Sequence, residues 1–130
     1  MFKYVRDNGK GGAIAPILKT IPANTATTYH DGDALVISSG KAAKAGATDV
    51  PEYVCATEGK GLEEIAAVQV LKGQEYKTTF AANATSVAVG AKVTLHTDSA
   101  QVTATTTSGV AEVIEKLGTG ASGTEVIVRF

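Results

Sequence analysis

The chain has 130 residues, and 21 Ala, 17 Thr, 14 Gly and 14 Val make up roughly half of it. This length and its modest share of large apolar residues predict one thin-cored domain. The 12 Lys and Arg stand against 13 Asp and Glu, so the net charge is −1. We therefore expect no nucleic-acid partner, since phosphate binding needs a basic surplus. No uncharged apolar run approaches the roughly 18 residues of a membrane span, so we also expect no membrane partner.

The first twelve residues differ from the rest and predict an N-terminal arm over residues 1–12, ahead of a single β domain over residues 13–130. This segment combines two aromatic residues, three bases and three glycines. Glycines without a periodic pattern are typical of a flexible terminus. Aromatic residues beside bases are also typical of a segment that orders on an acidic partner. On that second interpretation the partner-binding residues are Phe2, Lys3, Tyr4 and Arg6.

From Ala13 onward, short β-prone segments alternate with turn residues, which is typical of an all-β barrel or sandwich. The clearest strand is 124–130, because Val126, Val128 and Phe130 share one face. Residues 40–49 are polar and Ala-rich and predict a loop. Residues 110–117 also fit a helical spacing, but the flanking glycines leave a segment too short for a stable helix. The predicted strands are 13–18, 25–29, 34–38, 53–57, 66–71, 75–80, 92–97, 101–105, 110–117 and 124–130.

Two groups of residues could carry chemistry. The first is His30, Asp31 and Asp33, an imidazole and two carboxylates within four positions, which could ligate a metal. A tight Asp-Gly turn between strands explains the same residues without a metal, and we favour the turn. We therefore expect no metal and no cofactor.

The second group centres on Cys55, which could act as a nucleophile with His30 or His96 as its base. Its surroundings are an ordinary strand pattern, and a buried cysteine is the simpler interpretation. No carboxylate pair is set apart for acid–base work. We therefore expect that the protein is not an enzyme. A single cysteine excludes a disulfide within the chain and fits a reducing cytoplasm.

Two stretches, 78–91 and 99–111, contain no charged residue and are rich in Thr, Ala, Ser and Val. Such surfaces can pack against other proteins without desolvating a charge, because the centres of interfaces are depleted in Lys, Asp and Glu. The alternative is that both are simply hairpins with small side chains. Either way, the pattern favours assembly over catalysis.

A series of glycine-bounded strand segments resembles the small decoration (cement) proteins of tailed-bacteriophage heads. The segments are Gly32–Ile37 followed by Ser39-Gly40-Lys41, then Val89–Leu95, Asp98–Val102, Gly109–Val113 and the ending Gly123–Phe130. The resemblance covers roughly residues 30–130 as a pattern of strands and glycines. It offers no catalytic motif to carry over.

The resemblance implies a structural virion protein, assembled in the host cytoplasm, that coats the outside of the head and joins neighbouring major capsid subunits. We then expect the major capsid protein as partner, and self-association as a trimer, because a closed ring needs one heterologous patch. The capsid-binding residues would be the four of the predicted arm. Two alternatives stay open: another virion β module, such as a tail-tube or spike subunit, and a carbohydrate-binding adhesive module.

Overall fold

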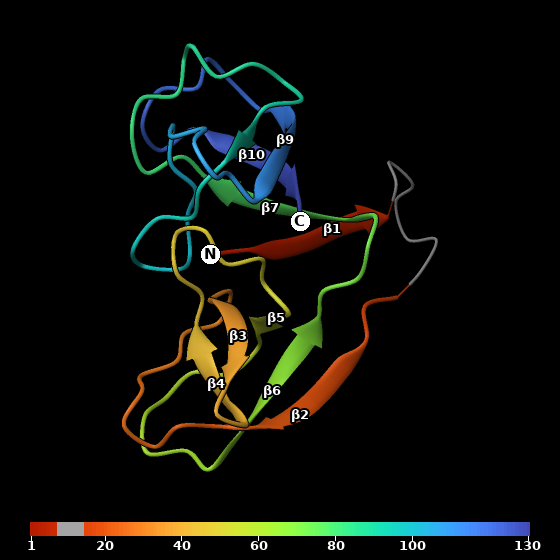
Figure 1. The fold of residues 1–130 in the computed structure, drawn as a ribbon. Helices are drawn as coiled ribbons and strands as arrows, with labels where there is room; N and C mark the ends of the chain where they lie inside the picture. The colour runs from red at the N-terminus through yellow and green to blue at the C-terminus, as the bar shows by residue number, and fades with distance from the viewer. Residues whose placement is uncertain (8–14) are drawn as a thin grey trace.

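The computed structural model of the chain describes residues 1–7 and 15–130, which form ten β-strands and no helix (Figure 1). All pairings between these strands are antiparallel. The strands are β1 (Lys3–Asp7), β2 (Leu18–Pro22), β3 (Ala34–Ser38), β4 (Lys41–Lys44), β5 (Tyr53–Cys55), β6 (Glu64–Gln69), β7 (Gln74–Thr79), β8 (Lys92–Val93), β9 (Ala111–Lys116) and β10 (Glu125–Arg129).

The strands form two five-stranded sheets that pack together as a sandwich. The order is β1-β7-β10-β9-β8 in the first sheet and β2-β6-β5-β3-β4 in the second. In Figure 1 the first sheet lies above the second, and β1 runs along the boundary between them. Tyr76 and Val128 from the first sheet meet Ala34 and Val54 from the second in an intersheet core. The prediction of an all-β barrel or sandwich is confirmed, in its sandwich form.

The central strands of the second sheet, β3 and β5, bury side chains on both faces. Ala34 and Val54 point into the intersheet core, whereas their chain neighbours Leu35 and Cys55 belong to a separate apolar cluster. This follows from the alternation of side chains along a strand. Tyr29 lies in the second cluster, and its hydroxyl donates a hydrogen bond of 2.7 Å to a backbone carbonyl of β4. The protein therefore has two thin apolar cores, one between the sheets and one on the other face of the second sheet.

The N-terminal residues form the edge strand of the first sheet, which corrects the predicted arm over the part that the structure describes. β1 pairs with β7, and the register shifts between Tyr4 and Arg6. Residues 4 and 6 of a regular strand would point to the same face. The irregularity instead places Tyr4 opposite Tyr76 and Arg6 opposite Glu75, on opposite faces of the sheet. Residues 8–12 of the predicted arm lie outside the described residues.

Aromatic side chains fasten the two chain ends together. Phe2 is 2% exposed, and its ring contacts Phe130 edge-on at 5.3 Å between centroids. Tyr76 lies between the pair Phe130 and Tyr4, with centroid distances of 5.6 and 6.0 Å. Over residues 1–7 the structure therefore corrects the predicted arm, because Phe2 and Tyr4 pack on the protein's own aromatic residues.

A glycine in the loop before β3 makes room for this docking. Gly32 has φ +86°, and its carbonyl accepts a hydrogen bond of 2.8 Å from the Phe2 N–H. A Cβ at this position would lie 2.4 Å from the Met1 Cβ and 2.9 Å from the Phe2 nitrogen. The Asp-Gly pair therefore shapes a turn and also receives the N-terminus.

Other strand predictions differ in place or length. Of the predicted strand 13–18, residues 13 and 14 lie outside the described residues and Leu18 begins β2. Residues 25–29 contribute only an isolated bridge at Tyr29, and residues 101–105 only isolated bridges through Val102. β8 covers just two residues of the predicted strand 92–97, and the predicted loop 40–49 contains β4. β4 reads Lys-Ala-Ala-Lys, which has low β propensity, and its pairing with β3 overrides that preference.

We expect Phe2→Ala to lower the free energy of unfolding by about 3–5 kcal/mol, because a large buried ring leaves a cavity. Denaturant unfolding followed by circular dichroism measures this loss. Val89→Ala is the control, since Val89 is 61% exposed and its truncation should change stability by about 0.5 kcal/mol or less. Equal stabilities of Phe2→Ala and wild type would restore the arm interpretation.

Candidate functional site

The four residues predicted to bind a capsid are brought together on β1 and at its start, but they do not form one exposed surface. Phe2 is buried, and Tyr4 is half-buried against Tyr76. Arg6 is ion-paired with Glu75 and Glu115. Only Lys3 is exposed, at a shallow hollow that Lys77 and Glu125 also line. In this fold Phe2 cannot contact a partner without leaving the core.

Arg6 instead belongs to an ionic network around a buried carboxylate. The Glu75 side chain is 1% exposed, and its two oxygens accept hydrogen bonds from Arg6 and from Arg129, the latter at 2.7 Å. Burial would raise the pKa of Glu75, but the hydrogen bonds from Arg6 and Arg129 outweigh it and hold that pKa below its ordinary value. The network joins β1, β7 and β10, and we interpret it as structural.

We expect Glu75→Gln to destabilise the fold by up to about 3 kcal/mol, because two partly buried arginines lose their carboxylate. A lowered folded-state pKa stabilises the protein above the unfolded-state pKa of about 4.3, and this stabilisation is lost as pH falls through the folded value. The variant should therefore lose less stability than wild type across that acid range. Unfolding measured between pH 7 and acid pH tests both effects.

The matched control for this prediction is Glu125→Gln. Glu125 is half-exposed and pairs with Lys77 at 3.1 Å, so its loss should cost about 0–1 kcal/mol. Equal losses in the two variants would contradict the structural role of Glu75.

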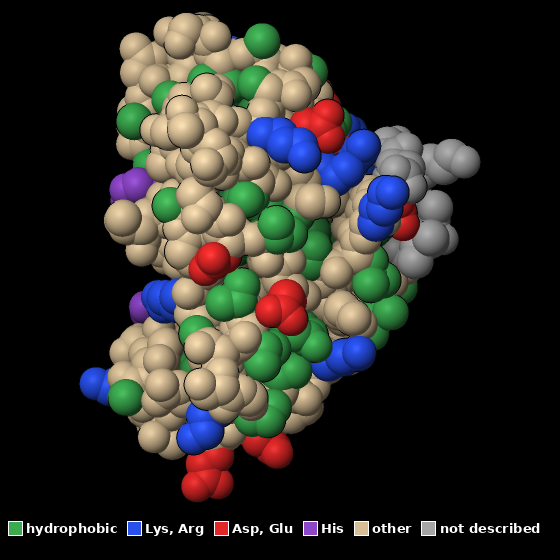
Figure 2. Space-filling model, viewed as in Figure 1, with side chains coloured by type: hydrophobic (Ala, Val, Ile, Leu, Met, Phe, Trp, Pro, Cys, Tyr) green, Lys and Arg blue, Asp and Glu red, His purple; other side chains and the backbone are tan. Residues whose placement is uncertain are grey.

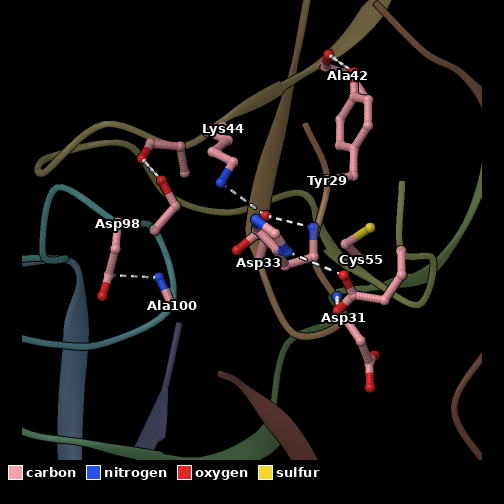
Figure 3. A network of polar contacts seen from close by, with 12 residues as sticks. Tyr29, Asp31, Asp33, Ala42, Lys44, Cys55, Asp98 and Ala100 are labelled. Carbon is pink, nitrogen blue, oxygen red and sulfur yellow. Dashed lines mark hydrogen bonds and ion pairs between the residues drawn. The ribbon is translucent and has the colours of Figure 1, made fainter. Parts of the chain in front are cut away.

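Residues of the His30–Asp33 cluster make hydrogen bonds and ion pairs that stabilise the turn (Figure 3). Asp33 is buried, accepts a hydrogen bond from the His30 backbone N–H at 2.9 Å and pairs with Lys44 at 3.0 Å. Glu58 accepts from the Asp31 backbone N–H, and its other oxygen contacts the His30 ring. Both contacts lower the pKa of Glu58, and the hydrogen bond from the Asp31 backbone has the larger effect. Within residues 1–7 and 15–130, no three His, Cys, Asp or Glu side chains are grouped to hold a metal ion.

The Cys55 side chain is buried on β5. Its thiol donates to the Thr57 carbonyl at 3.3 Å, and burial raises its pKa. The Nδ1 atom of His30 lies 3.0 Å from a Glu58 carboxylate oxygen, and that of His96 lies 3.2 Å from an Asp98 carboxylate oxygen. The arrangement matches a buried structural thiol.

The first predicted charge-free stretch forms an exposed loop at one end of the first sheet. The loop over residues 81–91 lies beside a second loop, 117–124, which also contains no charged residue. The Ala84 N–H donates to the Gly120 carbonyl at 2.7 Å, and the Ser122 hydroxyl donates to the Ala81 carbonyl at 3.1 Å. We call these two loops together the charge-free end.

Small side chains cover the charge-free end. Val89 and Leu117 are 61% and 43% exposed, and the exposed polar groups are hydroxyls and one amide, from Asn83, Thr85, Ser86, Thr119 and Ser122. In Figure 2 the top of the molecule, above the first sheet, is almost entirely tan and green, whereas red and blue side chains gather lower down. The two loops contain no carboxylate for a partner to desolvate, and the Lys116 ammonium at the end of β9 is bonded to carbonyls of loop 81–91.

The second predicted charge-free stretch, 99–111, is less exposed than the first. Ser99, Val102 and Ala111 are buried, residues 105–108 are exposed, and the remaining residues are half-buried. The sequence analysis selected this stretch and missed loop 117–124, although that loop also lacks charged residues. Three glycines and no charge separate Lys116 from Glu125.

Comparison of the chain with protein-family models, with curated proteins and with solved structures finds no match. Among the described residues, no helix is long and apolar enough to cross a membrane.

Proposed function

We propose that this is a structural, non-enzymatic virion protein that binds the outside of a phage head and stabilises contacts between major capsid subunits. The observation that carries the proposal is the charge-free end, a continuous exposed surface built from two loops. Covering it buries hydroxyls, methyl groups and backbone, which costs far less than burying unpaired charges. The resemblance to head decoration proteins supplies the partner, the major capsid protein, and the site on the exterior of a head assembled in the host cytoplasm.

The proposed mechanism is physical. Each copy would span a joint between capsid subunits and raise the free energy needed to open it. A standard interface of about 800 Å² per partner suffices for specific binding. Trimerisation would place three such ends around one axis, and engaging one subunit would raise the effective concentration for the next.

The carbohydrate-binding alternative is less well supported. Sugar-binding surfaces present aromatic faces for stacking. Every aromatic side chain of this protein is buried or half-buried: Phe2, Tyr29, Tyr76 and Phe80 are buried, and Tyr4, Tyr53 and Phe130 are half-buried. A tail-tube or spike module would also need a neutral contact surface, and assembly of the purified protein into tubes would favour it.

Co-sedimentation with bare expanded heads tests the proposal. We expect Val89→Asp to weaken head binding by more than about tenfold, because a carboxylate would be buried without a partner. Affinity for wild type should change little between low and high salt, since no exposed charge lies in the contact.

The matched control is Val50→Asp, a similarly exposed valine (58% against 61%) in the loop before β5. It should bind heads like wild type. Equal weakening by the two substitutions would move the binding surface elsewhere, and failure of the wild-type protein to bind heads would overturn the proposed function.

A further inference from the structure

Lys116 lies where the two loops of the charge-free end meet. It is the last residue of β9, and its ammonium lies 2.8 Å from the Val87 carbonyl oxygen, 3.3 Å from that of Thr85 and 3.4 Å from that of Ala84. An ammonium has three N–H donors, so these carbonyls can use all of them. The positive charge is thereby covered by backbone dipoles, and the surface around it remains neutral.

Gly120 provides the space for this contact from the second loop. It has φ +91°, and a Cβ there would lie 2.8 Å from the Ala84 oxygen and 3.2 Å from the Lys116 ammonium. A side chain would therefore displace the Ala84 carbonyl, which accepts hydrogen bonds from both the Lys116 ammonium and the Val87 N–H. Only glycine meets both the backbone angle and the close approach.

The Lys116 contact is separate from the core packing that folds the domain. Val87 and Ala84 enter the intersheet core through their side chains, whereas Lys116 bonds only to their backbone oxygens. Loss of the ammonium should leave the apolar contacts in place while the loop backbone samples other conformations.

We propose that Lys116 is a positioning residue that holds loop 81–91 in its binding conformation before the partner arrives. This inference rests on the proposed function of the charge-free end. Small side chains offer a partner few anchors, so ordering the loop during binding would consume much of the interaction. When only a fraction of molecules has the competent conformation, the apparent affinity falls by that fraction.

The test compares Lys116→Met with Lys92→Met. Both remove one positive charge from the first sheet, but Lys92 is exposed on β8 and makes no side-chain hydrogen bond within residues 1–7 and 15–130. Hydrogen exchange is followed at the Ala84 and Val87 amides, which bond to Gly120 and Ala84 within this region. We expect Lys116→Met to speed exchange there by about tenfold or more, with the global melting temperature within a few degrees of wild type.

Binding to bare heads is then measured for the same proteins. We expect Lys116→Met to weaken binding by about tenfold or more and Lys92→Met to match wild type. Gly120→Ala retains the lysine and is expected to show the same local loosening, so it replaces Lys116→Met if that variant unfolds. Faster exchange with unchanged binding, or unchanged exchange, would overturn the positioning role.

The two proposals fail in distinguishable ways. If wild type does not bind heads, the proposed function is wrong and the binding role of Lys116 falls with it, whatever the exchange rates show. If wild type binds and only the Lys116 comparison gives no difference, the proposed function stands and the positioning role alone is wrong.

Discussion

Burial of Phe2 between the two sheets is the contact on which the arrangement of the chain depends. The ring packs on Phe130, so the first and last segments of the protein close on one another. Its backbone N–H bonds to Gly32 in the loop before β3, which joins the first sheet to the second. Most other core side chains are Ala and Val, which bury little area each. Each of the few large rings in this core, Phe2 among them, therefore contributes a large share of the intersheet contact.

The register shift in β1 allows Phe2 and Tyr4 to pack in the core while Arg6 joins the ionic network on the opposite face of the first sheet. A regular strand would place Tyr4 and Arg6 on one face, forcing either the guanidinium into the core or the ring into solvent. The irregularity lets Tyr4 face Tyr76 and lets Arg6 reach Glu75. The same few residues thus supply apolar packing on one face and a charge-paired contact on the other.

Sequence patterns predicted the elements whose own residues carry the signal. Val126, Val128 and Phe130 alternate, and β10 is found there with Val126 and Val128 in the core. β4 was missed because its strand character comes from pairing with β3 rather than from its residues. β1 was missed because aromatic and basic residues before glycines look alike whether their partner is another protein or the chain's own core. The candidate site was predicted only in part. One charge-free loop was recognised and its neighbour was not, since the contact between them across residues 92–116 is a property of the fold.

A neutral surface of small side chains places a particular demand on the rest of the protein. Tight interfaces draw most of their affinity from a few Trp, Tyr and Arg anchors, and this end has none. The remaining sources of affinity are a low ordering cost and repetition. The first favours loops held by hydrogen bonds to their backbone, such as those from the Lys116 ammonium to the Ala84 and Val87 carbonyls. The second favours a partner that presents the same contact many times on one lattice, where modest single contacts add up. Under the proposed function, a neutral end without large anchors is therefore better matched to a repeating coat than to a single soluble partner.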